Sequence, residues 1–170
     1  MDELKYWHAV FTASRAEKKV RDRLEELGVE CFLPVQTVLR QWTYRKSRVV
    51  VPVIAGLMFV RVGRQEQVKV LQTKGVVAFL RLKGEAGAAV IPDKQMEDFR
   101  FLLDFSEEAV EMTNENIKAG DLVRVVKGSL RGMEGELIRH KGVTKVLVRI
   151  DMLGCAMVNI PASFVEKLNK

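Results

Sequence analysis

YWHAVF, residues 6–11, followed at once by TASRAEKKVRDRLEELG, residues 12–28, decides the fold of the first part of the chain. The first stretch is aromatic and β-branched without a helical period, so it predicts a strand. In the second stretch Ser14, with Glu17 three residues later, predicts a capping box, and apolar residues recur at helical spacing up to Gly28. Gly28 is typical of the residue that ends a helix. A strand that runs directly into an amphipathic helix is therefore expected.

The pattern of strands and helices continues to about residue 105. Residues 29–62 predict strands joined by a basic hairpin, and residues 68–82 predict a short helix followed by a strand. Pro92 predicts the start of a last helix with Met96, Phe99 and Leu103 on one face. Because the helices can cover a sheet, we predict an α+β or α/β sandwich over residues 1–105.

The chain changes character after residue 105. Residues 106–117 are polar and acidic without a sustained period, which predicts a linker between two domains. Residues 118–170 contain four short β-branched runs separated by glycines, and a fifth strand is expected near Phe164. Five strands in about 50 residues favour a small closed β-barrel, because closure removes exposed strand edges.

The composition is typical of a globular protein, and the distribution of charge favours an anionic partner. Of 170 residues, 48% are hydrophobic and 29% charged, and no apolar run reaches the roughly 20 residues of a membrane helix. The first residues lack the features of a signal peptide, so we expect a cytoplasmic protein without a membrane anchor. Residues 1–105 hold 18 basic and 13 acidic residues, 106–117 none and four, and 118–170 ten and five. Two basic blocks around an acidic connector favour a polyanionic partner.

Nothing in the sequence indicates catalysis. His8, His140, Cys31 and Cys155 show no spacing typical of a nucleophile, a zinc site or a redox pair. Neither a P-loop nor a dinucleotide-binding glycine motif is present. The protein is therefore expected not to be an enzyme, and to have no cofactor and no metal.

Two groups of cationic residues are candidate nucleic-acid sites. Arg15, Lys19 and Arg23 recur every four residues beside the apolar face of the first predicted helix. A solvated helix face remains the alternative, because acidic residues are interspersed. The hairpin segment RQWTYRKSR, residues 40–48, combines four cations with two aromatic rings and has no acid. Cations neutralise phosphates and rings stack on unpaired bases, so this segment favours contact with nucleic acid.

Apolar residues at bends are candidates for protein contacts. Residues 53–60 read as a buried central strand, or as a strand that bends at Ala55-Gly56 and turns Ile54 and Leu57 outward as a docking patch. Large apolar residues also occur at predicted turns in the C-terminal block, namely Leu130 and the pair 152–153. They either cap the core or contact a partner.

The order and spacing of several motifs resemble the NusG family over essentially the whole chain. The motifs are Trp7–Phe11 before the basic helix, Cys31-Phe32-Leu33-Pro34, Leu57-Met58-Phe59-Val60, Thr73-Lys74-Gly75-Val76, Ile91-Pro92, and Gly120–Val125 with Gly128, Gly132 and Gly135. The resemblance implies an N-terminal NusG domain, an acidic linker, and a KOW domain with a five-stranded SH3-like barrel. It also implies a non-enzymatic transcription elongation and antitermination factor that binds RNA polymerase.

The resemblance also assigns expected site residues. Those expected to bind RNA polymerase are Phe11, Ile54, Ala55, Leu57 and Phe59. The resemblance and the basic stripe and hairpin described above together give the residues expected to bind nucleic acid. These are Arg15, Lys19, Arg23, Trp42, Arg45, Lys46, Thr73 and Lys74. The KOW domain is expected to bind a second factor, such as the ribosome or a termination factor. The residues expected to make this contact are Leu130, Met152 and Leu153.

Ile54-Ala55-Gly56-Leu57 departs from the family, which usually has aromatic residues around a Pro-Gly or Pro-Asn pair there. The chain therefore looks more like a specialised paralogue, similar to RfaH and to the UpxY regulators of capsular polysaccharide operons. Such a factor would be a monomer that contacts the non-template DNA strand or the nascent RNA at particular operons. A general NusG elongation factor and a ribosome-associated KOW protein that binds RNA are the alternatives.

Overall fold

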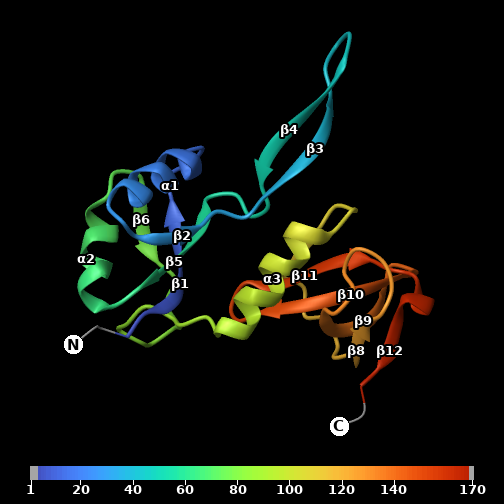
Figure 1. Ribbon diagram of the computed structural model, residues 1–170. Coiled ribbons are helices and arrows are strands. Elements are labelled where there is room, and N and C mark those ends of the chain that lie inside the picture. Colours follow the sequence, from blue (N-terminus) through green and yellow to red (C-terminus); the bar gives the residue numbers. More distant parts are fainter. Residues whose placement is uncertain (1–3, 169–170) are drawn as a thin grey trace. The chain divides into compact units, whose positions relative to one another are not determined.

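The computed structural model describes residues 4–168, which divide into two compact units (Figure 1). The first unit comprises the residues up to 35 together with 50–93, and the second comprises 36–49 together with the residues from 94 onward. Helices and strands are mixed, as the sequence predicts. The hairpin and the last helix group with the second unit, whereas the sequence pattern predicts both within the sandwich of residues 1–105. No helix within residues 4–168 is long and apolar enough to span a membrane.

An antiparallel four-stranded sheet forms the centre of the first unit. Its strands, in spatial order, are β2 (Glu30–Phe32), β5 (Leu57–Val62), β1 (Tyr6–Thr12) and β6 (Val76–Phe79). The pairing of Val10 with Met58 and of Phe11 with Leu57 sets the register of β1 on β5. Because side chains alternate along a strand, Val10 and Met58 share one face of the sheet, and Phe11 and Leu57 share the other.

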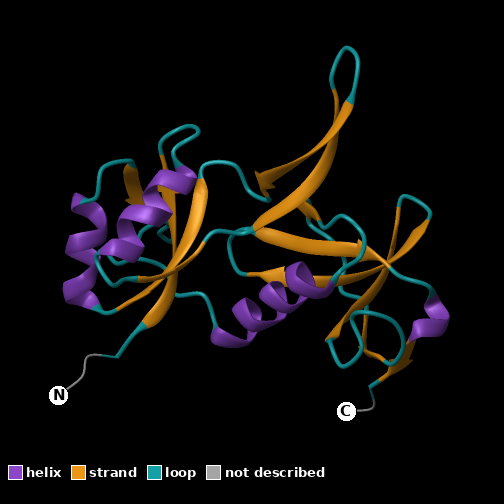
Figure 2. Cartoon of the chain, turned by 45° about the horizontal axis from the view of Figure 1, so that its top comes forward, coloured by secondary structure: helices purple, strands orange, loops and turns teal. Residues whose placement is uncertain are grey.

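Two helices, α1 (Glu17–Glu26) and α2 (Arg64–Gln72), also belong to the first unit (Figure 2). Val20 and Leu24 of α1 and Val70 of α2 join Val10 and Met58 in one buried apolar cluster. The helices therefore pack on the face of the sheet that carries Val10. Trp7, Ala9, Phe11, Leu57 and Phe59 lie on the opposite face, by the alternation of β1 and β5.

The predicted capping box of α1 is wrong, whereas its predicted end is confirmed. Ala16 is the N-cap residue, and no side chain caps the helix. Glu17 instead accepts a hydrogen bond from the backbone N–H of Gly56, at 2.9 Å. At the other end the N–H of Val29 bonds Leu24 O and that of Gly28 bonds Glu25 O, with a φ of +75° at Gly28. This pair of bonds is a Schellman motif, which favours glycine at that position.

In the second unit the hairpin and the last helix have the character that the sequence predicts. β3 (Val35–Gln41) and β4 (Lys46–Pro52) form a two-stranded sheet of their own. α3 (Asp93–Phe105) follows Pro92 and buries Met96, Phe99 and Leu102. Leu103, which was expected on the buried face, is half-buried.

The rest of the second unit is an antiparallel sheet of six strands. In spatial order these are β12 (Val165–Lys167), β8 (Asp121–Val125), β9 (Glu134–His140), β10 (Val143–Ile150), β11 (Gly154–Asn159) and β7 (Glu111–Thr113). A short 3₁₀ helix, η1 (Ala162–Phe164), precedes β12. Five strands were expected after residue 117, and β7 is an additional strand within the predicted linker.

β7 is fastened to the sheet by backbone pairing and by an ion pair. Thr113 pairs with Cys155 and Glu111 with Met157 of β11. The ammonium of Lys145, itself nearly buried, lies 2.7 Å from a carboxylate oxygen of Glu111. The hydrogen bond from Lys145 lowers the pKa of Glu111. An ionised Glu111 therefore favours the attached strand.

Acid should weaken the attachment of β7. Because the pKa of Glu111 is lower in the folded state, its contribution is complete above the pKa of an unfolded glutamate, about 4.3, and disappears as the pH falls through the lowered value. Glu111 is half-exposed, so we expect less than about 1 kcal/mol. Glu111→Gln should reduce the difference in thermal stability between about pH 7 and pH 3. Glu108→Gln is the matched control, because Glu108 is exposed and forms no ion pair within residues 4–168, and an equal effect of both variants would contradict this role.

Candidate nucleic-acid and protein interfaces

The turn that joins β4 to β5 presents apolar side chains at the end of β1. Phe11 is 39% exposed, Ala55 is exposed and Ile54 is half-buried. Backbone bonds hold the turn in place, from Thr12 N to Gly56 O at 2.9 Å and from Val53 N to Pro34 O at 2.8 Å. We call Phe11, Ile54 and Ala55 the apolar turn surface.

Two of the residues expected at the polymerase-binding surface lie in the core. Leu57 is 2% exposed and Phe59 is fully buried, stacked on Phe32 with ring centroids 6.3 Å apart. The alternative in which Ile54 and Leu57 both turn outward is thus wrong for Leu57. It is paired with Phe11 in the sheet, but its side chain is enclosed. The accessible part of the expected surface is the apolar turn surface.

α1 and the loop of residues 73–75 form one basic surface in the first unit. Arg15, Lys19 and Lys74 are exposed and are named here the α1-loop cations. Arg15 precedes the helix in the left-handed region, at φ +61°, so the predicted stripe is helical only from Lys19. The guanidinium of Arg23 donates to Lys74 O at 2.7 Å, which ties the loop to the helix.

Glycine is required where this loop meets the helix. A Cβ on Gly75 would lie 2.6 Å from Cγ2 of Val20, and the residue has a φ of +99°. Thr73 is buried, and its hydroxyl donates to Lys69 O at 2.8 Å. Arg23 and Thr73 therefore position the loop, whereas Lys74 is free to meet a ligand.

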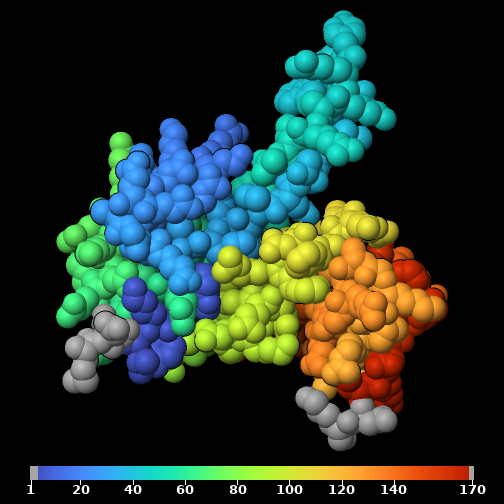
Figure 3. Space-filling view, viewed as in Figure 1, coloured from blue at the N-terminus to red at the C-terminus, as the bar shows by residue number. Residues whose placement is uncertain are grey.

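The tip of the β3–β4 hairpin gathers rings and cations. Backbone bonds between Trp42 and Arg45 in both directions close the turn, and the indole N–H of Trp42 donates to the hydroxyl of Ser47. Trp42 is 50% exposed and Tyr44 is 97% exposed. Figure 3 shows the outer half of the hairpin, in cyan, uncovered by other parts of its unit. Tyr44, which was not among the expected site residues, is the more accessible ring.

In the described part of the chain, the cations of the α1-loop and hairpin surfaces have no carboxylate partner, unlike several other cations. Lys5, Arg124, Lys145 and Arg149 are all held by carboxylates at 2.6–2.9 Å. Within residues 4–168, by contrast, no side-chain ion pair or hydrogen bond holds the three α1-loop cations or the hairpin cations Arg40, Arg45, Lys46 and Arg48. Unpaired exposed cations are available to neutralise phosphates, and they produce a positive potential.

The residues expected to bind a second factor separate into core and surface. Leu130 folds back between Gly128 and Gly132 and is 6% exposed. Met152 is 39% exposed with a φ of +70°, and Leu153 is half-buried. The turn between β10 and β11 therefore keeps an accessible apolar side chain, whereas Leu130 caps the core.

Each histidine is held by a hydrogen bond, and both cysteines are free thiols. His8 donates from Nδ1 to Ala89 O, and His140 lies 3.2 Å from Glu115. Burial raises the pKa of Cys31 to about 11, which keeps its thiol protonated near neutral pH. The described part of the chain holds no group of three or more residues that could bind a metal.

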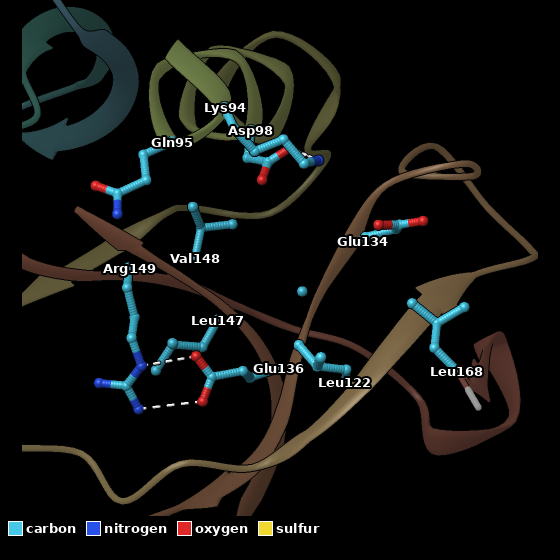
Figure 4. A pocket seen from close by; sticks show the side chains of 11 residues that line it. Lys94, Gln95, Asp98, Leu122, Glu134, Glu136, Leu147, Val148, Arg149 and Leu168 are labelled. Carbon is cyan, nitrogen blue, oxygen red and sulfur yellow. Dashed lines mark hydrogen bonds and ion pairs between the residues drawn. The ribbon is translucent and has the colours of Figure 1, made fainter. Parts of the chain in front are cut away.

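A pocket of about 250 Å³ lies between α3 and the sheet of the second unit, and four of its charged side chains form two ion pairs (Figure 4). The guanidinium of Arg149 donates to both oxygens of Glu136, at 2.6 and 3.1 Å. Lys94 pairs with Asp98 at 2.9 Å. The first pair links β10 to β9, and the second lies within α3.

Comparison with known proteins identifies similar sequences and structures. A family model described as NusG, transcription termination factor nusG, matches residues 5–100, more than half of the chain. The structure titled "Domain interaction in Thermotoga maritima NusG" is 23% identical with a TM-score of 0.52, over 97% of this chain and 98% of that chain. This likeness is one of fold.

A crystal structure of the MjSpt4:Spt5 complex, conformation B, is 18% identical over 96% of this chain and 97% of that chain. Its TM-score of 0.29 is too low to support a conclusion. No curated protein sequence matches the chain.

Proposed function

The chain belongs to the NusG family, and as a member it is a transcription elongation factor; from this premise we propose that it binds RNA polymerase and contacts nucleic acid within the elongation complex as an operon-specific antitermination factor. The role needs binding and no chemistry, and therefore no cofactor or metal. We place the protein in the cytoplasm, as a monomer.

The unpaired cations and exposed rings of the hairpin tip carry this proposal. Arg45 and Lys46 stand beside Trp42 and Tyr44, without an acidic residue anywhere in residues 36–52. Cations neutralise the phosphates of a strand, while rings stack on its bases, so this combination suits an unpaired strand. The displaced DNA strand of the transcription bubble, or the nascent RNA, offers such a ligand.

The apolar turn surface is the proposed contact with RNA polymerase. Phe11 supplies the aromatic side chain, and Ile54 and Ala55 supply small apolar area beside it. The family more often has aromatic residues at the turn, and aromatic anchors dominate binding energy at protein interfaces. A weaker grip on polymerase suits a factor that needs a nucleic-acid signal for recruitment, which favours the specialised role over the general one.

The proposed domain division is a NusG domain at residues 1–105, a connector at 106–117, and a KOW domain at 118–170 with an SH3-like barrel. Met152, with Leu153 beside it, is the proposed contact for a second factor, such as the ribosome or a termination factor. An exposed methionine adapts readily to a partner surface.

Single-round transcription with the cognate RNA polymerase tests the proposed function. One template carries the leader upstream of this protein's own gene, and the other is unrelated. Read-through of a terminator on the own leader alone is the expected result. An equal effect on both templates would establish the general elongation factor, and no effect on either would overturn the proposal.

Removing two of the four hairpin cations should weaken binding and its dependence on salt. For a single strand, each neutralised phosphate contributes about 0.7 to the slope of log affinity against log salt. Arg45→Ala with Lys46→Ala should therefore lower the slope by about 1.4 if both contact phosphates. Fluorescence anisotropy on a single-stranded oligonucleotide with the sequence of the leader measures this slope.

A matched control uses Lys127→Ala with Arg131→Ala, which removes the same two charges from exposed positions in the second unit. It should leave the slope nearly unchanged. Equal slopes for both double variants would show that only the net charge matters.

A further inference from the structure

The side chain of Gln36, at the base of the hairpin, forms two hydrogen bonds with the backbone of Val110, in the connector of residues 106–117. Its amide nitrogen donates to Val110 O at 3.3 Å, and its amide oxygen accepts from Val110 N at 3.1 Å. Val110 is 5% exposed, so neither backbone group can easily turn to water. Glutamine carries a donor and an acceptor on one group, which suits this paired contact.

The connector is itself anchored next to this contact. Val110 directly precedes β7, which pairs with β11 and is held by the ion pair between Glu111 and Lys145. Gln36 therefore fastens the base of the hairpin to a strand that belongs to the main sheet of the second unit. The Val110 contact lies 74 residues away in sequence, so it is a tertiary restraint on the hairpin.

The hairpin needs such a restraint, because no third strand within residues 4–168 pairs with β3 or β4. An isolated two-stranded hairpin is marginally stable in water. At about 3.3 Å per residue, the five steps from Gln36 to Gln41 place the tip about 17 Å from the base. A pivot of about 10° at the base would then move the tip by about 3 Å, the length of a hydrogen bond.

We infer that Gln36 is a positioning residue for nucleic-acid binding, which holds the rings and cations of the hairpin tip in a binding-competent orientation through its two hydrogen bonds to Val110. This inference rests on the proposed function of the hairpin. Gln36 does not itself touch the nucleic acid. Without it the tip samples orientations that cannot bind, and the apparent affinity falls with the fraction of competent molecules.

The test separates positioning from contact by affinity and salt dependence together. Gln36→Met keeps the length of the side chain and removes both hydrogen bonds, and Gln36→Ala also removes its packing. Both variants should weaken binding of the leader oligonucleotide about five- to 150-fold, from two lost hydrogen bonds. The salt slope should stay unchanged, because the bound state neutralises the same phosphates. Thr37→Ala, at the exposed neighbouring residue, should bind like the original protein.

Hydrogen exchange supplies an independent readout. The amide of Val110 should exchange faster in both Gln36 variants, because it loses its acceptor. Unchanged affinity with faster exchange at Val110 would overturn the inference, and so would a salt slope that falls with the affinity. If Arg45→Ala with Lys46→Ala binds normally, the hairpin is not the nucleic-acid site, and the proposed function fails together with the inference. Loss in that double variant, with normal binding by both Gln36 variants, overturns the inference alone.

Discussion

Leu57→Ala is expected to lower the free energy of unfolding of the first unit by about 2 to 5 kcal/mol, the range for truncating a buried leucine. Leu57 is 2% exposed and lies on β5, which pairs with both β1 and β2. The loss combines the transfer free energy of the side chain with the cavity left behind. Leu57→Asp should be more damaging, because it also buries a carboxylate. Chemical denaturation followed by circular dichroism measures the difference.

Phe11→Ala is the matched variant, because Phe11 is the cross-strand neighbour of Leu57 and is 39% exposed. It should unfold at a denaturant concentration close to that of the original protein, while losing most of its co-purification with RNA polymerase. If Leu57→Ala unfolded normally, its side chain would not be part of the core. If Phe11→Ala kept full polymerase binding, the apolar turn surface would not be the contact.

Local sequence patterns predicted the elements well where one physical cause dominates. Gly28 ends α1 because two backbone bonds require a residue that adopts a positive φ. Pro92 precedes α3 because its fixed φ suits the start of a helix. Ser14 and Glu17 were misread because a capping box and a tertiary contact look alike in sequence. Only the folded chain brings the N–H of Gly56 to the carboxylate of Glu17.

The sequence pointed to candidate site residues by their type, but it did not predict which of them are exposed. The family resemblance grouped Phe11, Leu57 and Phe59, which share one face of the sheet, yet of these three only Phe11 is accessible. Among the cations, Arg23 is committed to the carbonyl of Lys74, a contact that no local spacing signals. For the same reason, the contact of Gln36 and the strand β7 were not predicted. A polar residue in a strand and a short acidic stretch carry no signal of their pairing partner.

β7 shows how a connector too polar to form a core can still be ordered. Its backbone completes the edge of the second sheet, so the fixed partner strand supplies most of the structure. Edge strands recruit extended chain in this way because their outer N–H and C=O groups are unpaired. The connector thus links the hairpin and the sheet through ordinary hydrogen bonds. A change at β7 should therefore reach the hairpin through Val110 and Gln36.

Gly154→Ala is the substitution that should disturb β7 most. A Cβ on Gly154 would lie 2.1 Å from Thr113 O, and the residue has a φ of +108°. Both obstacles are backbone features, so relief requires β7 to move away from β11. We expect a loss of more than about 2 kcal/mol in the stability of the second unit, above the cost of the positive φ alone. Faster hydrogen exchange at Thr113 and Val110 would locate the damage at β7.

Gly142→Ala separates the steric contact from the backbone strain. Gly142 has a φ of +80° in the turn between β9 and β10, and a Cβ there would meet nothing within 4 Å. This variant should lower the free energy of unfolding only by the cost of a left-handed alanine, about 1 to 2 kcal/mol. Hydrogen exchange at Thr113 should not become faster. The excess loss in Gly154→Ala then measures the close approach of β7. Equal losses in the two variants would mean that β7 can move at no cost, and the restraint that Gln36 places on the hairpin would lose its anchor.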